Sequence, residues 1–260
     1  RCFEDENITH VNGTIDPISD IETINLELIL ADLEFAQKCL ETQSRKSKSH
    51  EKEEIKKMKF LQKTKTYLEN EKPIRSLELS KEETILLKTY PFLTAKKVIY
   101  VANISEDMLN QENEIITKIQ THLANTGDKL LTLCTKLESE IALLDAEEKE
   151  EYLKSFEIEE SGLNKLSKKC FDLLGLQTYL TTGEKETRSW TIHKGSTAPQ
   201  AAGVIHTDFE KGFIRANIIK YEDFLSCNGW KHAKEKGLLK QEGKEYIMRE
   251  GDVVEFLFNV

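Results

Sequence analysis

The stretch KVIYVANISEDMLNQENEIITKIQTHLANTGDKLLTLC, residues 97–134, decides the fold class of this 260-residue chain. An apolar run over residues 97–102 ends at Asn103, and such a run is typical of a strand buried on both faces, as in a parallel sheet. A helix is predicted over residues 111–124 and a second apolar strand over residues 129–134. Strand, helix and strand form a βαβ unit, so the sequence predicts an α/β domain.

A helical hairpin is predicted before this unit. Asp16-Pro17 is a strong helix start, because Asp caps a helix and Pro fits its first turn. The first helix is expected to bury the residues that recur at helical spacing: Ile21, Ile24, Leu28, Ala31, Phe35 and Cys39. A second helical set contains Ile55, Met58, Leu61 and Leu68, and the polar stretch SRKSKSHEKEE at 44–54 separates the two as a charged tip.

Capping and strand signals organise the rest of the chain. Ser80 followed by Glu83 is a capping box that opens a short helix through Leu87. Near Gln177 the pattern changes to short strands around one helix, which predicts a small α+β module. Its strands are expected at 187–193, 213–220, 245–248 and 253–258, and its helix at 199–205.

Composition excludes several classes of protein. Charged residues make up 32% of the chain, and no stretch approaches the roughly 18 uninterrupted apolar residues of a membrane-spanning helix. The five cysteines have no close pair, which argues against a disulfide framework or a zinc knuckle and favours a reduced, cytosolic chain. The six histidines show no metal-ligand spacing.

Two stretches are candidate contacts for nucleic acid. The formal net charge is −9, yet residues 38–72 hold 11 Lys or Arg against 6 Asp or Glu. Such a basic segment suits a polyanion, although a solvated helix face with interleaved Lys and Glu is the simpler interpretation. The stretch HTDFEKGFIR at 206–215 mixes aromatic and basic residues, as a nucleic-acid face does. The alternative is a connection that packs Phe209 and Phe213 inward.

Polar residues follow both strands of the βαβ unit. Ligands of open α/β sheets bind beyond the carboxyl ends of the strands, which is where Asn103 and Glu106 fall. An Asn offers amide donors and an acceptor to a purine edge. A carboxylate accepts from the 6-amino group of adenine and repels the carbonyl oxygen of guanine there. Cys134-Thr135-Lys136 follows the second strand on the other side. A capped turn is the alternative interpretation of Asn-x-x-Glu.

A phosphate-binding loop is missing from these residues. The nearest pattern runs from Gly237 to Gly243-Lys244, with five intervening residues where four are needed, and Glu245 stands where Ser or Thr would bind Mg²⁺. No nucleophile–base pair stands out either.

The order of these pieces resembles the YchF (Obg-like ATPase) family of P-loop NTPases. The stretches that carry the resemblance are residues 1–34, RSLELSKEE at 75–83, FLTAKKVIYVANISED at 92–107, residues 163–216 and EGDVVEFLFNV at 250–260. Residues 178–260 resemble the TGS module, a ubiquitin-like β-grasp domain that also occurs in threonyl-tRNA synthetases.

The resemblance implies an α/β fold with a partial G-domain sheet, an inserted α-helical coiled-coil hairpin and an α+β β-grasp domain. Residues 1–37 and 75–176 would belong to the G domain, 38–74 would form the insertion and 177–260 the TGS domain. The phosphate loop, the switch regions and the Mg²⁺ ligands would then precede residue 1, so that the chain would be the C-terminal part of a longer protein.

The resemblance also implies a base-reading motif at Asn103–Glu106, in which Glu replaces the Asp usual in GTPases. ATP would accordingly be preferred to GTP. Ile104 would contact the nucleotide through its backbone, and Cys134, Thr135 and Lys136 would flank the base. We expect no catalytic residue and no metal ligand in these residues, and therefore feeble ATP binding and no hydrolysis by this chain alone.

The function expected for the intact protein is that of an ATP-dependent molecular switch in the cytoplasm, with the large ribosomal subunit and RNA as partners and no membrane association. The candidate RNA contacts are Lys46, Lys48, Lys52, Lys56, His206, Phe209, Lys211 and Arg215. One alternative is a non-enzymatic RNA- or ribosome-binding adaptor. A second alternative, an accessory region of a tRNA-charging enzyme, fits poorly because nothing upstream of the β-grasp resembles a synthetase.

Overall fold

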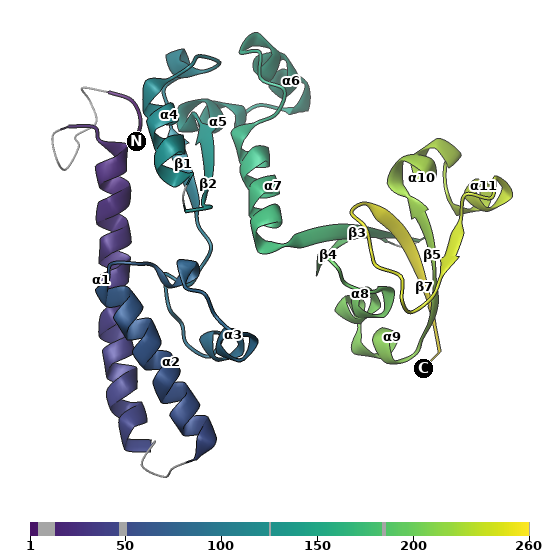
Figure 1. The fold of residues 1–260 in the computed structure, drawn as a ribbon. Helices are drawn as coiled ribbons and strands as arrows, with labels where there is room; N and C mark the ends of the chain where they lie inside the picture. The colour runs from purple at the N-terminus through teal and green to yellow at the C-terminus, as the bar shows by residue number, and fades with distance from the viewer. Residues whose placement is uncertain (5–13, 47–50, 125, 184–185, 260) are drawn as a thin grey trace. The chain divides into compact units, whose positions relative to one another are not determined.

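The computed structural model describes residues 1–4, 14–46, 51–124, 126–183 and 186–259. The chain divides into two compact units, Arg1–Leu166 and Ser167–Val260. Figure 1 labels their helices and strands. No helix within the described ranges is both long enough and apolar enough to cross a membrane. Each of the five cysteines is a free thiol.

A helical hairpin forms the first part of unit one. Helix α1 spans Pro17–Lys46 and α2 spans Lys52–Glu69, and the two lie side by side (Figure 1). Oδ1 of Asp16 accepts hydrogen bonds from the amides of Ile18 and Ser19, both at 3.2 Å, which confirms the predicted helix start. Because α1 continues through residue 37, the expected limit of the insertion falls inside a helix. The four domain limits stay predictions.

The buried face of α1 matches the predicted one only in part: Ile21, Phe35 and Cys39 are half-buried and pack against core residues. Ile24 is 55% exposed and Ala31 is also exposed, although both belong to the expected apolar set. The residues that α1 buries are Ile29, Asp32, Ala36 and Gln43. Two of them are polar and have partners elsewhere in the chain: Asp32 binds the segment after α3, and Gln43 donates to the carbonyl of Glu54 at 3.1 Å. The fully buried positions of α1 are therefore not the members of the expected apolar set.

The hairpin core is closed by the segment that follows α2. Helix α2 buries Phe60, Leu61, Thr64 and Leu68. A 3₁₀ turn at Ile74–Ser76 and helix α3 at Lys81–Leu87 come next, and Phe92 packs edge-on against Phe35 with ring centroids 5.3 Å apart. The predicted capping box of α3 is confirmed, because Ser80 and Glu83 each bond the other's amide.

The predicted βαβ unit follows. Strand β1 at Ile99–Asn103 pairs in parallel with β2 at Lys129–Leu133, and α4 at Glu114–Leu123 connects them. The expectation that the first strand is buried on both faces is wrong for the described part of the chain. Ala102 packs with α4, whereas Val101 is 43% exposed and lines an open hollow beside β1. Three helices complete this region: α5 at Thr135–Ile141, α6 at Ala146–Ser155 and α7 at Gly162–Leu174.

Unit two is built on a five-stranded sheet with the order β4-β3-β7-β5-β6. The strands are β3 Leu176–Thr182, β4 Thr187–His193, β5 Phe213–Lys220, β6 Lys240–Glu242 and β7 Asp252–Phe258. Strands β3 and β7 pair in parallel and the other neighbours are antiparallel. The helices are α8 Ala198–Ile205, α9 Thr207–Lys211, α10 Tyr221–Cys227 and α11 Trp230–Glu235.

The two faces of this sheet have separate cores. Ile218 and Val254 pack with Ala201 of α8, whereas the next residues along the strands, Ile219 and Val253, pack with the α10–α11 side. Successive side chains of a strand point to opposite faces, so the two cores follow directly from the strand period.

One predicted strand of unit two is wrong. Residues 245–248 form a loop, and the strand that pairs with β5 is β6 at Lys240–Glu242. Within the loop, Ile247 makes an isolated bridge to Thr197. Two backbone hydrogen bonds hold the loop, from the amide of Ala198 to the carbonyl of Tyr246 at 2.9 Å and from the amide of Met248 to the carbonyl of Ser196 at 3.0 Å. The Tyr246 hydroxyl also donates to the carboxylate of Asp252 at 2.9 Å. The predicted helix at 199–205 and the strands at 187–193, 213–220 and 253–258 are confirmed within a residue or so.

Candidate functional site

The candidate site lies where β1 and β2 end. The parallel register aligns Asn103 with Leu133, so the residues that follow each strand meet at one edge of the sheet. This is the edge at which open α/β sheets bind their ligands. After β1 the chain forms a 3₁₀ turn at Glu106–Met108, and after β2 it enters α5.

Asn103 joins the two strand ends through its side chain. Its Oδ1 accepts a hydrogen bond from the amide of Thr135 at 3.0 Å. This bond orients the side-chain amide, whose nitrogen has no hydrogen-bond partner among the described residues. Asn103 can therefore donate to a ligand acceptor without breaking a contact of the protein.

Glu106 forms an ion pair with Lys136. The Glu106 carboxylate lies 3.2 Å from Nζ of Lys136, and 31% of the Glu106 side chain and 69% of the Lys136 side chain are exposed. The hydrogen bond from Lys136 and the negative charge of Glu106 raise the pKa of the lysine. A pair this exposed is weak, so a ligand amine can replace the lysine at the carboxylate.

Ile104 and Cys134 form the buried floor of the site. They are 5% and 3% exposed. The amide of Ile104 donates to the carbonyl of Leu133 at 3.0 Å, so the carbonyl of Ile104 is the backbone group left for a ligand. The structure thus gathers at one edge all six residues expected to bind nucleotide: Asn103, Ile104, Glu106, Cys134, Thr135 and Lys136.

Sequence reasoning missed two residues that flank the site. The hydroxyl of Tyr152 on α6 donates to the carboxylate of Glu140 on α5, and this bond raises the pKa of Tyr152 to about 12. Glu140 follows Lys136 by one helical turn, a spacing that puts both on one side of α5. That spacing was the only local signal for Glu140, and Tyr152 had none.

Sequence reasoning also missed a link from α5 to α7. The Glu138 carboxylate accepts from the amides of Gly162 at 2.5 Å and Leu163 at 3.1 Å, at the start of α7. A Cβ at Gly162 would come within 2.8 Å of Cβ of Leu133, so this close approach requires glycine. Helix α5, which begins at the candidate site, therefore holds the first turn of α7.

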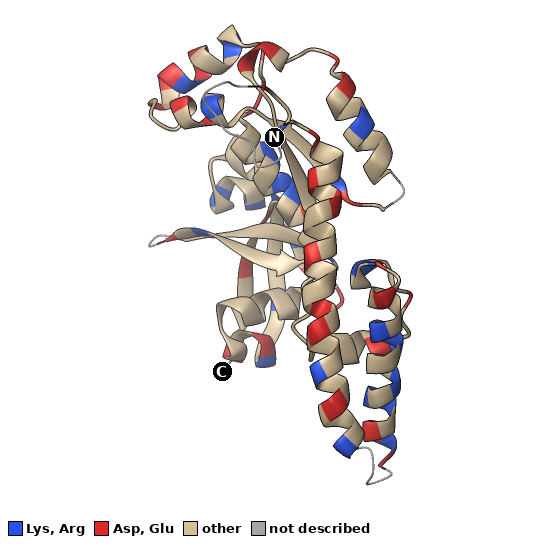
Figure 2. Cartoon of the chain, turned by 90° about the vertical axis from the view of Figure 1, so that its left-hand side faces the viewer, with Lys and Arg blue, Asp and Glu red and all other residues tan. Residues whose placement is uncertain are grey.

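The described candidate RNA contacts of unit one lie toward the tip of the hairpin, where α1 ends and α2 begins. Figure 2 shows Lys and Arg gathered on α2 and toward the hairpin tip. Lys46 ends α1 and Lys52 begins α2, whereas Lys48 lies outside the described residues. Lys56 is paired with Glu82 at 2.8 Å. Carboxylates thus neutralise part of the positive charge counted along the sequence.

The other four candidates lie in unit two. The ring nitrogen Nδ1 of His206 accepts from the amide of Asp208 at 3.2 Å, and Phe209 stacks on Phe258 with ring centroids 3.8 Å apart. Lys211 is exposed, and Arg215 bonds Gln241 at 3.2 Å. Phe213, at 4% exposure, belongs to the core, and the half-buried Phe209 packs against it. Both rings therefore pack inward, as the alternative interpretation of residues 206–215 predicts.

Among the described residues there is neither a cluster of metal-ligating side chains nor a phosphate-binding loop. No three His, Cys, Asp or Glu side chains come together there in a way that would hold a metal ion. Gly237 lies between α11 and β6 and Gly243 follows β6, so this pattern lacks the strand-to-helix turn of a phosphate loop. The candidate site offers a ligand an amide donor at Asn103 and a carboxylate acceptor at Glu106.

Comparison with known proteins identifies relatives along the whole chain. A family model named YchF-GTPase_C, described as a protein of unknown function (DUF933), matches residues 176–259. The ribosome-binding ATPase YchF of Bacillus subtilis (strain 168) is 48% identical over 262 residues, covering 100% of this chain and 72% of that protein. The ribosome-binding ATPase YchF of Escherichia coli O157:H7 is 45% identical, covering 100% of this chain and 71% of that protein.

A solved structure gives the same picture. The structure of the Schizosaccharomyces pombe YchF GTPase superposes with a TM-score of 0.84 at 37% identity, over 98% of this chain and 70% of that one. The names of these relatives differ in the nucleotide: the two bacterial proteins are called ATPases and the S. pombe protein a GTPase.

Proposed function

The chain belongs to the YchF family, and from this premise we propose that it is part of a P-loop NTPase that prefers ATP to GTP and acts at the ribosome. The observation that carries the nucleotide half of the proposal is the pairing of Asn103 and Glu106 with Thr135 and Lys136 across two parallel strand ends. The names of the relatives support the ribosomal half.

Base selection rests on two groups. The free amide nitrogen of Asn103 donates to a ring nitrogen of the purine, a contact that adenine and guanine share. The carboxylate of Glu106 accepts from the 6-amino group of adenine, which takes the place of Lys136. Guanine carries a carbonyl oxygen at that position, and two acceptors facing each other without a proton repel. Glu106 is thus the residue that selects ATP.

Holding and hydrolysing the phosphates of ATP needs a phosphate loop, and the sequence of residues 1–260 does not contain one. Phosphate and Mg²⁺ contacts supply most of the positioning and charge neutralisation in phosphoryl transfer. The sequence has no Gly-x-x-x-x-Gly-Lys-Ser/Thr. Among the described residues, no three His, Cys, Asp or Glu side chains come together in a way that would hold a metal ion. We propose that the intact protein supplies these groups, with ATP and Mg²⁺, from outside these residues, and that this chain contributes base recognition to the ATP site.

Glu106→Asp in the intact protein tests the nucleotide proposal. The wild type is expected to bind ATP more tightly than GTP. Asp is one methylene shorter, so its carboxylate lies further from the 6 position and both its bond to the adenine amine and its repulsion of the guanine carbonyl weaken. The ratio of the two dissociation constants is therefore expected to shift toward GTP by about tenfold. Titration with fluorescent ATP and GTP analogues measures this ratio. The control is Glu151→Asp, the same change at an exposed position on α6 that lines none of the pockets around the site. An unchanged ratio in Glu106→Asp would favour the non-enzymatic adaptor instead.

For ribosome binding we propose that the hairpin is the coiled-coil insertion of the family and that unit two is its β-grasp TGS domain. The strand order β4-β3-β7-β5-β6, with a central parallel pair and α8 packed on one face, supports the β-grasp assignment. The excess of Lys and Arg over residues 38–72 supports a contact with RNA. Lys52 forms no ion pair with any described residue, whereas Lys56 is taken by Glu82.

Salt dependence tests this contact. Binding of the intact protein to large ribosomal subunits is expected to weaken steadily between about 50 and 200 mM salt, because phosphate contacts release counterions. Lys52→Ala is expected to reduce both the affinity and the salt slope. Lys154→Ala, which removes a lysine already paired with Glu150, is the matched control. Salt-independent binding would contradict the proposal.

A further inference from the structure

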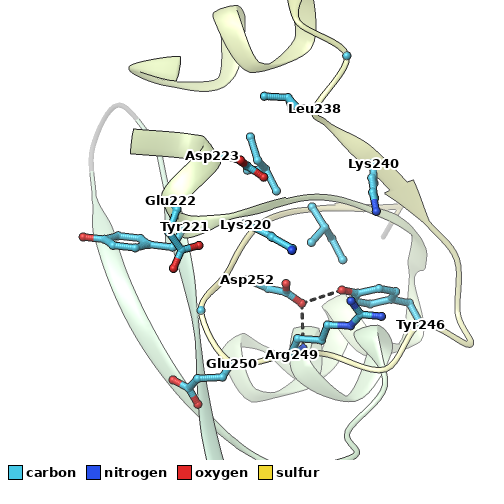
Figure 3. Close-up of a pocket in the computed structure, with 14 residues that line it drawn as sticks. Lys220, Tyr221, Glu222, Asp223, Leu238, Lys240, Tyr246, Arg249, Glu250 and Asp252 are labelled. Carbon is cyan, nitrogen blue, oxygen red and sulfur yellow. Dashed lines mark hydrogen bonds between the residues drawn. The ribbon is translucent and has the colours of Figure 1, made fainter. Parts of the chain in front are cut away.

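A pocket of about 340 Å³ opens at one end of the sheet in unit two (Figure 3). It is lined by the end of β5, the start of α10, the start of β6, the loop before β7 and the first residue of β7. Its size is at the lower end of the range for small-molecule sites, about 300–1,000 Å³. None of its lining residues is among the six residues expected to bind nucleotide, so a function of this pocket is independent of the proposed nucleotide site.

Strand register places charged side chains on one face of the sheet here. Lys220, the last residue of β5, lies directly opposite Asp252, the first residue of β7. Lys240 lies opposite Ile218, two residues before Lys220. Residues opposite each other in an antiparallel pair share a face, as do residues two apart in one strand. Two lysines and one aspartate therefore face the same side, beyond the apolar core around Ile218.

Asp252 is buried with one oxygen unused. It is 4% exposed, and its Oδ2 accepts from the Tyr246 hydroxyl and the Arg249 amide, both at 2.9 Å. Oδ1 accepts no hydrogen bond from any described residue. Burial raises the pKa of Asp252, although the two hydrogen bonds oppose this effect. Oδ1 is not among the fully buried unpaired atoms of the described residues, so it reaches the space of the pocket, where a ligand donor can bond it.

Three cations around the pocket also lack partners. Lys220, Lys240 and Arg249 form no ion pair within 4 Å of a described carboxylate. Figure 3 shows the amines of Lys220 and Lys240 directed toward the space next to Asp252, with the Arg249 guanidinium beside Tyr246.

The acidic residues at the rim do not neutralise these cations. Glu250 accepts hydrogen bonds from the amide and the hydroxyl of Thr178. In Figure 3, Glu222 and Glu250 lie on the side of the pocket away from Lys240, whereas Asp223 lies nearer the middle. The side formed by Lys240 and Arg249 is therefore positively charged.

We propose that this pocket binds a phosphorylated ribose, with the phosphate at Lys220, Lys240 and Arg249 and a sugar hydroxyl donating to Oδ1 of Asp252. Charge-assisted bonds from Arg and Lys are the strong contacts of phosphate groups. A carboxylate that accepts from a ribose hydroxyl is the usual partner of the sugar in nucleotide sites. The same chemistry belongs to a free nucleoside monophosphate and to the phosphorylated end of an RNA.

Calorimetric titration of the intact protein with ribose 5-phosphate tests the site. This probe has no base, so it does not engage Asn103 and Glu106. It is expected to bind at least about tenfold more tightly than either ribose or inorganic phosphate, because each of these satisfies only half of the pocket. Equal affinity for ribose 5-phosphate and inorganic phosphate, or no binding of the sugar phosphate, would overturn the proposal.

Two variants and a control locate the binding. Lys240→Ala removes a phosphate contact, and Asp252→Asn can keep the bonds from Tyr246 and Arg249 while turning the free acceptor into a donor. Each is expected to weaken ribose 5-phosphate binding by about tenfold. Lys231→Ala, at an exposed lysine on α11 that does not line the pocket, is expected to leave it unchanged. If Asp252→Asn unfolds at a lower temperature than the wild type, the affinity of Lys240→Ala for ribose 5-phosphate is the deciding result. An unchanged affinity in Lys240→Ala would overturn the proposal.

Competition identifies the source of the phosphorylated ribose. Displacement of ribose 5-phosphate by an RNA oligonucleotide with a 5′-phosphate, but not by one with a 5′-hydroxyl, would support the site and assign it to an RNA end. Displacement by nucleoside monophosphates alone would support the site and assign it to a free nucleotide.

Discussion

Asp32 ties the buried side of α1 to the segment that follows α3. Its carboxylate accepts from the amide of Leu93 at 2.8 Å and from the amide and the hydroxyl of Thr94, both at 2.7 Å. Asp32 is 2% exposed. Asp32→Ala leaves these donors unsatisfied, so we expect the free energy of unfolding to fall by about 3 kcal/mol or more. Urea denaturation of the chain measures this change.

A neighbouring residue supplies the control for Asp32. Glu34→Ala removes an exposed carboxylate on the same helix whose side chain pairs with Lys38. Its unfolding midpoint is expected to match the wild type within error. Equal midpoints for Asp32→Ala and Glu34→Ala would mean that the carboxylate of Asp32 does not hold this segment.

No sequence pattern could have predicted the role of Asp32. Its partners lie 61 and 62 residues further along the chain, and a helical period assigns polar residues to solvent. Separation in sequence also hides the ion pair of Glu106 with Lys136, which are 30 residues apart. The sequence identified both residues as candidates for one site, because each follows a predicted parallel strand, but their mutual contact required the structure.

At the scale of elements, the capping box of α3 gives a pH-dependent contribution to stability. The Glu83 carboxylate accepts from the amide of Ser80 at 2.8 Å and from Nζ of Lys63 at 3.0 Å. These hydrogen bonds, first the one from Ser80, hold the pKa of Glu83 below its usual range. The unfolded chain therefore takes up the proton first as the pH falls.

Glu83→Gln measures this contribution, because Gln keeps the capping acceptor and removes the charge. The stability lost in the variant is expected to be full above the unfolded pKa of about 4.3 and to vanish as the pH falls through the lower folded value. Thermal melts of both proteins between about pH 3 and 7 give the difference. A difference that stays constant across this range would contradict the role of the charge.

The elements that the sequence predicted well have local signals. The starts of α1 and α3 depend on side chains within three residues of the amides that they cap, at Asp16 and Ser80. The failed strand at 245–248 has the opposite cause. Its alternation suits a strand, but the Tyr246 hydroxyl and the Arg249 amide both donate to the Asp252 carboxylate. The segment therefore lines a pocket. Alternation carries no information about such a tertiary anchor.

At the scale of the whole molecule, base recognition and phosphate chemistry are separable. Residues 1–260 contain the strand ends to which we assign base recognition, and their sequence contains no phosphate loop. We expect this chain, purified alone, to release no phosphate from ATP above the buffer blank with or without Mg²⁺. A phosphate-release assay checks this. A Mg²⁺-dependent rate that is lost in Asn103→Ala would show that the chain carries its own hydrolytic site.

Glu106 is the residue on which the assignment of ATP depends most. The measurement that tests it most directly is a crystal structure of the intact protein with a non-hydrolysable ATP analogue. We expect the carboxylate of Glu106 within about 3.2 Å of the adenine 6-amino nitrogen, with Lys136 moved away from its present 3.2 Å contact. An adenine bound elsewhere, with Glu106 still paired to Lys136, would contradict base recognition by these residues.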